Sequence, residues 1–241
     1  MIYKDTFRIG LDDLNREKQL KNKAILKILE DVAGFHSDYV HYGINEIFGN
    51  GIAWALLDWE IEIKKRPQYG DLLEVETWGR APGRCHVYRD FRIFVNGELC
   101  VIATSKWMLM DLIHRRPMKI PVEMMTAYEP EPHLFVLTDA ELPKLREPEQ
   151  TEFVMEYPIR KTDIDINGHL HNTNYLDIAL EAMEGECFAD VVHFRISYRK
   201  EIMYGSPVKV YRSAGQEGNT TCYILKNQSE NEIHAFIEIR E

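Results

Sequence analysis

The chain has 241 residues, of which 45% are hydrophobic and 28% are charged, and its formal net charge is −10. This composition excludes an intrinsically disordered chain, and the negative charge argues against general binding to nucleic acid or to anionic membranes. The length allows one large domain or two smaller ones.

The beginning of the chain does not read as a secretion signal, because charged and apolar residues alternate there without an apolar core. No apolar run approaches the roughly 18 residues of a membrane span. Four cysteines, at positions 85, 100, 187 and 222, have no CxxC spacing, which argues against a disulfide framework or a cysteine zinc site. We therefore expect a cytoplasmic protein with free thiols, no metal and no cofactor.

The first half begins with one helix and continues as strands. Apolar residues recur at helical spacing over residues 19–33, which predicts a helix with one buried face. From Trp59 onward the apolar residues alternate, which is typical of a half-buried strand, and a second strand is predicted beyond Tyr69-Gly70. Asn96-Gly97 lies between two alternating runs in residues 91–109 and predicts a tight β-hairpin.

A proline-rich segment separates the two halves. Residues 117–148 hold six of the ten prolines, together with several acidic residues. Prolines at this density interrupt helices and central strands. We assign residues 1–120 to a first unit, residues 121–150 to a linker and residues 151–241 to a second unit.

The second half repeats the plan of the first. A helix is predicted over residues 173–184, and alternating strands follow in 194–210 and 222–239. A Tyr-Gly turn recurs at an offset of 135 residues, at Tyr69-Gly70 and Tyr204-Gly205. A pair of basic residues precedes each of these turns at the same offset. We therefore predict an α+β fold made of two units, each with a long helix wrapped by an antiparallel sheet, and expect the two sheets to be continuous.

The segment DIDINGHLHNTNYL, residues 163–176, concentrates short polar side chains before the second helix. Asp165, Asn167 and His169 occupy alternate positions, so an extended chain would point them the same way. Asn172 follows at a place suited to a helix N-cap. These residue types suit attack on a carbonyl, since a histidine can accept a proton from water and amide N–H groups can stabilise an oxyanion.

Two other interpretations of this segment stay open. Asn- and Asp-rich turns commonly precede helices without any catalytic role. His169 and His171, with nearby aspartates, can also bind a divalent ion, although no further clustered ligands appear in the sequence.

Several motifs in order resemble the acyl-acyl-carrier-protein thioesterases of plants and bacteria. The segment Asp165-Ile166-Asn167-Gly168-His169 resembles the D-x-N-x-H loop of that family. Other landmarks that resemble the family are Arg66-Pro67 with Gly70-Asp71, Val75 to Trp78, Ala103 to Trp107, Arg115-Arg116-Pro117 with Ile120-Pro121, and Tyr198-Arg199-Lys200-Glu201.

The resemblance implies a tandem hotdog fold and hydrolysis of fatty acyl-acyl carrier protein, with water as the nucleophile. It implies a catalytic set of Asp165, Asn167, His169 and Glu201 in the second unit, while the first unit lacks that set and serves substrate binding. Ile202 stands where many relatives have a cysteine, which disfavours a covalent cysteine route. Either Glu201 or His169 can be the base.

The implied partner is acyl carrier protein bearing a phosphopantetheine-linked chain, and a homodimer is a further possibility. Because the carrier is acidic, we expect it to dock on a local basic patch. The candidates are Lys64, Lys65, Arg66, Arg115, Arg116, Lys119, Arg199 and Lys200. The alternatives are an acyl-CoA thioesterase, a hydratase-type enzyme and a non-enzymatic acyl-binding protein on the same fold.

Overall fold

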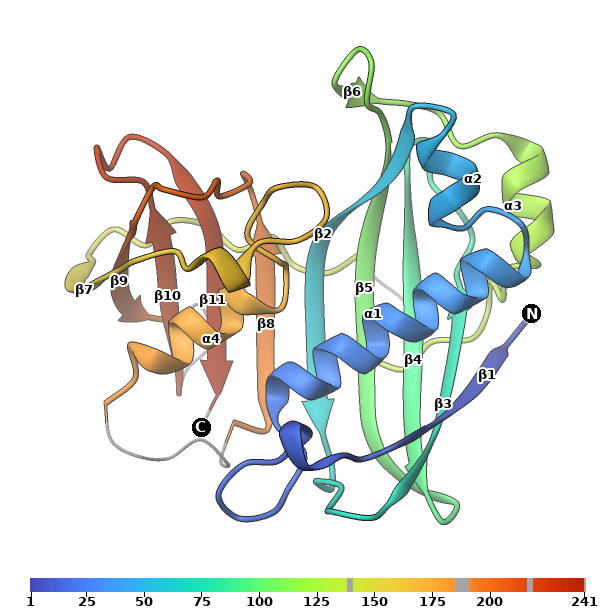
Figure 1. The fold of residues 1–241 in the computed structure, drawn as a ribbon, viewed down its shortest axis with the longest axis horizontal. Coiled ribbons are helices and arrows are strands. Elements are labelled where there is room, and N and C mark those ends of the chain that lie inside the picture. The colour runs from blue at the N-terminus through green and yellow to red at the C-terminus, as the bar shows by residue number, and fades with distance from the viewer. Residues whose placement is uncertain (138–140, 185–190, 216–218, 241) are drawn as a thin grey trace. The chain divides into compact units, whose positions relative to one another are not determined.

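A computed structural model describes residues 1–137, 141–184, 191–215 and 219–240 (Figure 1). The chain divides into two compact units, Met1–Glu141 and Leu142–Glu241. In the described part of the chain, no helix is both long enough and apolar enough to cross a membrane.

The first unit is an antiparallel sheet with the strand order β1-β3-β4-β5-β2, and β6 pairs with β5. Its strands are β1 (Tyr3–Arg8), β2 (Ile52–Ile63), β3 (Leu72–Gly79), β4 (His86–Val95), β5 (Glu98–Asp111) and β6 (Arg116–Pro117). Its helices are α1 (Asn22–Tyr39), α2 (Ile44–Phe48) and α3 (Val122–Tyr128), with a 3-10 turn at Leu11–Asp13. Figure 1 shows α1 lying across one face of this sheet.

Helix α1 is longer than the predicted helix over residues 19–33, which ended too early. Gly34 lies inside the helix and does not end it, because the buried stripe continues beyond it through His36 to Val40. Packing of an apolar face against a sheet outweighs the helix-weakening effect of one glycine.

The second unit has the same plan in a shorter form, with the strand order β8-β11-β10-β9-β7. Its strands are β7 (Glu152–Tyr157), β8 (His193–Tyr198), β9 (Val208–Ala214), β10 (Thr220–Lys226) and β11 (Ile233–Arg240). A 3-10 turn at Lys161–Asp163 precedes helix α4 (Asn174–Glu181), which is shorter than the predicted residues 173–184.

The predicted duplication is confirmed by connectivity. In each unit the first strand pairs with the third, and the third, fourth, fifth and second follow in that order. Gly70 and Gly205, which follow the two tyrosines of the repeat, have φ of +87° and +89°. The hairpin at Asn96-Gly97 is also confirmed, with both residues at positive φ. The continuity of the two sheets stays a prediction.

Part of the expected linker belongs to the first unit. Residues 122–128 form α3, which buries Met124, Met125 and Tyr128 in an apolar cluster with Val87 and Leu109. The proline-rich composition hid this helix, because Pro121 occupies its N-cap position and not its interior.

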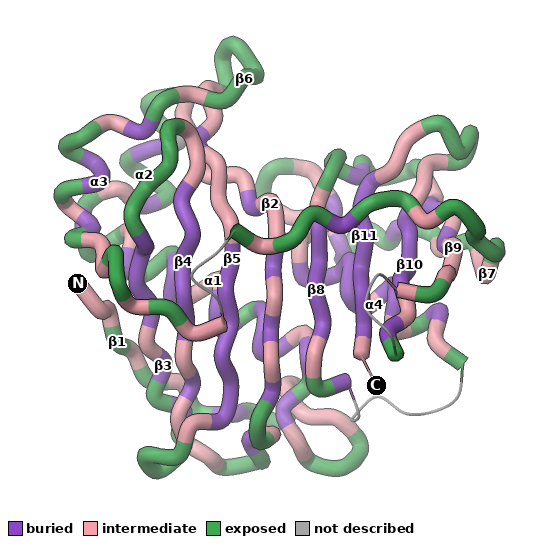
Figure 2. The backbone as a smooth tube through the Cα atoms, turned by 180° about the vertical axis from the view of Figure 1, so that it is seen from behind, coloured by how far each residue is buried: buried purple, intermediate pink, exposed green. Residues whose placement is uncertain are grey.

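Residues 142–150, which we call the strap, run across the strands of the second sheet (Figure 2). Leu145 is buried in a cluster with Cys222, Ile224 and Phe236. The carbonyl oxygens of the strap accept hydrogen bonds from two arginines of the sheet, Arg195 to Pro143 and Arg199 to Leu145. The strap therefore covers part of the core of its own unit.

The interior of the first unit contains a buried histidine that makes its stability sensitive to acid. Arg89 donates to Nδ1 of His36 over 2.9 Å, and Tyr3 stacks on the imidazole. Burial, followed by the charge of Arg89, lowers the pKa of His36 to about 3. Since an unfolded histidine has a pKa near 6.5, the unfolded chain binds a proton between about pH 3 and 6.5 that the folded chain does not bind.

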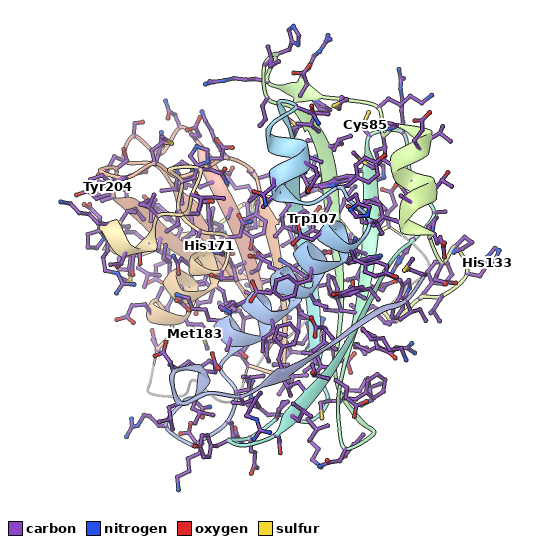
Figure 3. All side chains as sticks on the ribbon, turned by 45° about the vertical axis from the view of Figure 1, so that its right-hand side comes forward. Cys85, Trp107, His133, His171, Met183 and Tyr204 are labelled. Carbon is purple, nitrogen blue, oxygen red and sulfur yellow. The ribbon has the colours of Figure 1, made fainter. Side chains whose placement is uncertain are left out.

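We therefore expect the free energy of unfolding to fall as pH falls through this window, by up to about 1.4 kcal/mol per pH unit from this group. His36→Gln keeps an acceptor for Arg89 but removes the titration, so its urea-unfolding free energy should fall less steeply between pH 7 and 5. His133→Gln is the control, because His133 lies at an exposed position on the periphery of the first unit (Figure 3). Equal pH slopes for the wild type and His36→Gln would contradict this assignment.

Candidate active site

The polar segment of the second unit is a tight turn and not an extended chain. The Asp165 carboxylate accepts the backbone N–H of Asn167 over 2.8 Å and that of His169 over 3.1 Å. Gly168 has φ of +82°, and the Asp165 N–H donates to the carbonyl of His169. An aspartate that bonds the backbone ahead of it closes the turn locally, which overrides the alternation of the side chains.

Asn167 is held in the same turn through its side chain. Its Nδ2 donates to Asp165 Oδ2 over 3.2 Å, and its side chain is exposed. An amide nitrogen has two hydrogens, so a second N–H is available in addition to the one that faces Asp165.

The prediction that Asn172 caps helix α4 is wrong. The N-cap position is Thr173, and no side chain makes a capping bond there. The carbonyl of Asn172 accepts the hydroxyl of Tyr198 over 3.0 Å. The chain makes one more turn before the helix, since the Asn174 N–H donates to the carbonyl of His171.

Glu201 reaches this turn from a distant part of the sequence. Its Oε2 lies 3.4 Å from Nε2 of His169, and the exposed fractions of the two side chains are 72% and 26%. The segment after β8 is fixed beside the turn by the N–H of Leu170, which donates to the carbonyl of Ile202, and by a bridge between His169 and Met203. The structure thus brings together all four predicted catalytic residues.

Tyr175 supports this arrangement and was not among the predicted site residues. It is almost fully buried on α4, and its hydroxyl is hydrogen-bonded to the backbone of Ile202. Its ring meets that of Tyr198 edge-on, with the ring centroids 5.1 Å apart. Burial raises its pKa, and the nearby carboxylates of Glu201 and Asp165 add to the effect. No local pattern in the sequence predicts this role, because the contact of its hydroxyl depends on tertiary packing.

The first unit contains the same turn without the acid–base groups. Asn15 accepts the N–H groups of Glu17 and Gln19 over 3.1 and 2.9 Å, and Lys18 has φ of +63° where the second turn has Gly168. Arg66 stands at the position of Glu201 and donates to the carbonyl of Leu20 over 2.8 Å. The turn is therefore a feature of the fold, and the histidine–glutamate pair is specific to the second unit.

The structure gives no support to a metal at this turn. Among the described residues, no group of three or more His, Cys, Asp or Glu side chains is arranged to hold a metal ion. Nδ1 of His171 lies 3.0 Å from the hydroxyl of Thr173, so this histidine is engaged within its own turn.

Most of the eight predicted docking cations are already engaged. Lys64 pairs with Glu62, Lys65 with Glu98, Arg116 with Asp111 and Lys200 with Glu232, while Arg66 and Arg199 donate to backbone carbonyls. Within the described part of the chain, Arg115 and Lys119 are the two of these eight residues with neither an ion pair nor a side-chain hydrogen bond. Paired surface charges attract a partner less strongly than free ones. The basic patch as a docking surface stays a prediction.

Comparison with known proteins assigns the chain to a family. Residues 1–128 match the model of the acyl-ACP thioesterase N-terminal domain, and residues 146–240 match that of its C-terminal domain. The chain belongs to the acyl-ACP thioesterase family. The boundary between the two matches falls between the two structural units.

Curated members of the acyl-ACP thioesterase family are similar over most of this chain. An oleoyl-acyl carrier protein thioesterase of Arabidopsis thaliana is 28% identical over 83% of the chain. A palmitoyl-acyl carrier protein thioesterase of Cuphea hookeriana is 24% identical over 97%. The chain spans about 60% of the length of each of these two relatives.

Solved structures of the family share the fold. An acyl-ACP thioesterase from Bacteroides thetaiotaomicron has a TM-score of 0.88 at 19% identity, covering 99% of this chain and 97% of its own. A 12:0-ACP thioesterase from Umbellularia californica has a TM-score of 0.80 at 20% identity, covering 99% and 96%. The predicted α+β tandem hotdog fold is confirmed.

Proposed function

We propose that this chain hydrolyses the thioester of fatty acyl-acyl carrier protein to free fatty acid and carrier protein thiol. The observation that carries the proposal is the His169–Glu201 pair, with its two atoms 3.4 Å apart beside the turn that holds Asn167. Membership of the acyl-ACP thioesterase family supports the substrate class.

In this proposal the His169–Glu201 pair takes a proton from water as the water oxygen attacks the thioester carbonyl carbon. The carbonyl oxygen becomes an oxyanion, which Asn167 stabilises with the N–H that does not face Asp165. Asp165 orders the turn that presents both groups. The C–S bond then breaks, and the proton held by the pair passes to the departing sulfur.

The cysteines give no support to a covalent route. Within the described residues, Cys85, Cys100 and Cys222 are free thiols. Burial raises the pKa of the Cys100 thiol, and it raises that of Cys222 to about 12, so neither is a thiolate at neutral pH. Cys187 lies outside the described residues. Water is therefore the nucleophile that we propose.

The acyl chain is proposed to bind in the first unit, near its helix. Each buried methylene contributes about 0.8 kcal/mol, and one methylene discriminates only about 10- to 200-fold. A closed end of the binding space must therefore set the preferred chain length. The cytoplasmic location and the homodimer stay predictions, and the plant relatives named above are chloroplastic.

The proposal is tested with a panel of acyl carrier protein thioesters of differing chain length, scored for released free acid. We expect turnover on at least one chain length, and a higher kcat/KM than on the matching acyl-CoA. A higher kcat/KM on acyl-CoA would favour the acyl-CoA thioesterase instead. Tight acyl binding without acid release would identify a non-enzymatic acyl-binding protein.

A further inference from the structure

Three large apolar side chains are exposed on the two segments that build the site. Ile166 is 79% exposed within the turn, while Met203 and Tyr204 are 53% and 52% exposed just after Glu201. Met203 pairs with His169, which joins the two segments at this point. Single exposed apolar residues are ordinary, but several on the segments of one site indicate an interaction surface. We call these three residues the apolar rim.

The fold itself does not require apolar residues at these places. In the first unit the equivalent turn carries Arg16 in place of Ile166, and Gln68 in place of Met203. Gln68 bridges to Gln19 as Met203 bridges to His169, so the backbone is the same. Tyr69 corresponds to Tyr204 and is 58% exposed. Two of the three rim positions are therefore apolar only in the unit that carries the histidine–glutamate pair.

The two basic side chains beside Glu201 are both engaged within the chain, Lys200 by a carboxylate and Arg199 by a neutral carbonyl. Lys200, next to Glu201, is bonded to Glu232, and Arg199 donates to the carbonyl of Leu145. A partner that approaches Glu201 therefore meets exposed apolar area beside cations that already have partners. Apolar contact at the centre of an interface contributes more to affinity than screened charges at its edge.

We propose that the apolar rim is the surface on which the acyl carrier protein docks while its phosphopantetheine arm presents the thioester to His169. The inference rests on the proposed function and adds the place of the partner. A carrier seated on the segments that hold both groups lies beside the His169–Glu201 pair to which it delivers its thioester. The rim belongs to those segments.

The test combines Ile166→Ser, Met203→Gln and Tyr204→Ser, where the glutamine copies the first unit. We expect KM for acyl carrier protein substrate to rise about tenfold or more, with kcat at saturation unchanged. Hydrolysis of a small acyl-pantetheine thioester, which has no protein part, should be unchanged. Tyr69→Ser is the matched control, because it removes an equally exposed tyrosine from the equivalent turn, and it should leave KM unchanged.

A triple variant whose KM on carrier substrate equals that of wild type would overturn the proposal. The proposal would also be overturned if the triple variant lost as much kcat/KM on the pantetheine thioester as on the carrier substrate. A wild-type dimer that becomes monomeric in the triple variant, with KM unchanged, would identify the rim as a contact between copies and overturn it too. Wild-type chain that hydrolyses neither substrate would overturn the proposed function and the rim together, whereas active wild type with unaffected rim variants overturns the rim alone.

Discussion

Replacing His169 by alanine is expected to lower kcat about 10²- to 10⁴-fold, because the imidazole handles the proton of the attacking water. Glu201→Gln should cause a loss in the same range, since the carboxylate lies 3.4 Å from the imidazole and shares its task. The double variant should be little worse than either single variant, because groups that act as a unit have non-additive effects.

The matched control for His169 is Gln19→Ala, since Gln19 has the same place in the turn of the first unit. It should retain wild-type kcat. Release of free acid from acyl carrier protein substrate gives the rates, and urea unfolding shows that each variant folds. A folded His169→Ala chain with near wild-type kcat would remove the histidine from the mechanism.

Replacing Asn167 by alanine is expected to lower kcat about 10²- to 10³-fold, the usual loss when one oxyanion donor is removed. The side chain has no ionisable group, so the shape of the pH–rate profile should stay that of the wild type. KM should change little, because the donor acts mainly on the charge that develops in the transition state.

Glu17→Ala is the control for Asn167, because Glu17 occupies the corresponding place in the first turn and its N–H is bonded by Asn15 as that of Asn167 is by Asp165. Its rate should match that of wild type. If Asn167→Ala raised KM in proportion to its loss of kcat/KM and left kcat intact, Asn167 would be a binding residue and the oxyanion role would be wrong.

The sequence predicted those parts of the fold that depend on local patterns. Alternation of apolar residues and the Asn96-Gly97 turn identified strands and a hairpin, because each pattern acts over a few neighbouring residues. The end of α1 was missed, since the burial of His36 beyond Gly34 depends on packing against other elements. The 135-residue offset identified the duplication because it compares the chain with itself.

The candidate site was predicted in composition and not in geometry. Asp165, Asn167, His169 and Glu201 follow from motif resemblance, but the backbone hydrogen bonds by which Asp165 closes the turn were not predicted. The approach of Glu201 depends on the bond from Leu170 to Ile202, which joins segments about 30 residues apart. No local pattern in the sequence encodes such a pairing.

The way the strap is attached has a consequence for its tolerance of sequence change. Arg195 and Arg199 bond to the carbonyl oxygens of Pro143 and Leu145, and every amino acid supplies such an oxygen. Most positions of residues 142–150 can therefore vary without loss of these acceptors, while the two arginines supply donors that few other side chains can replace. In a library of random variants, the strap would accept exchanges at most positions, and the arginines beneath it would accept few.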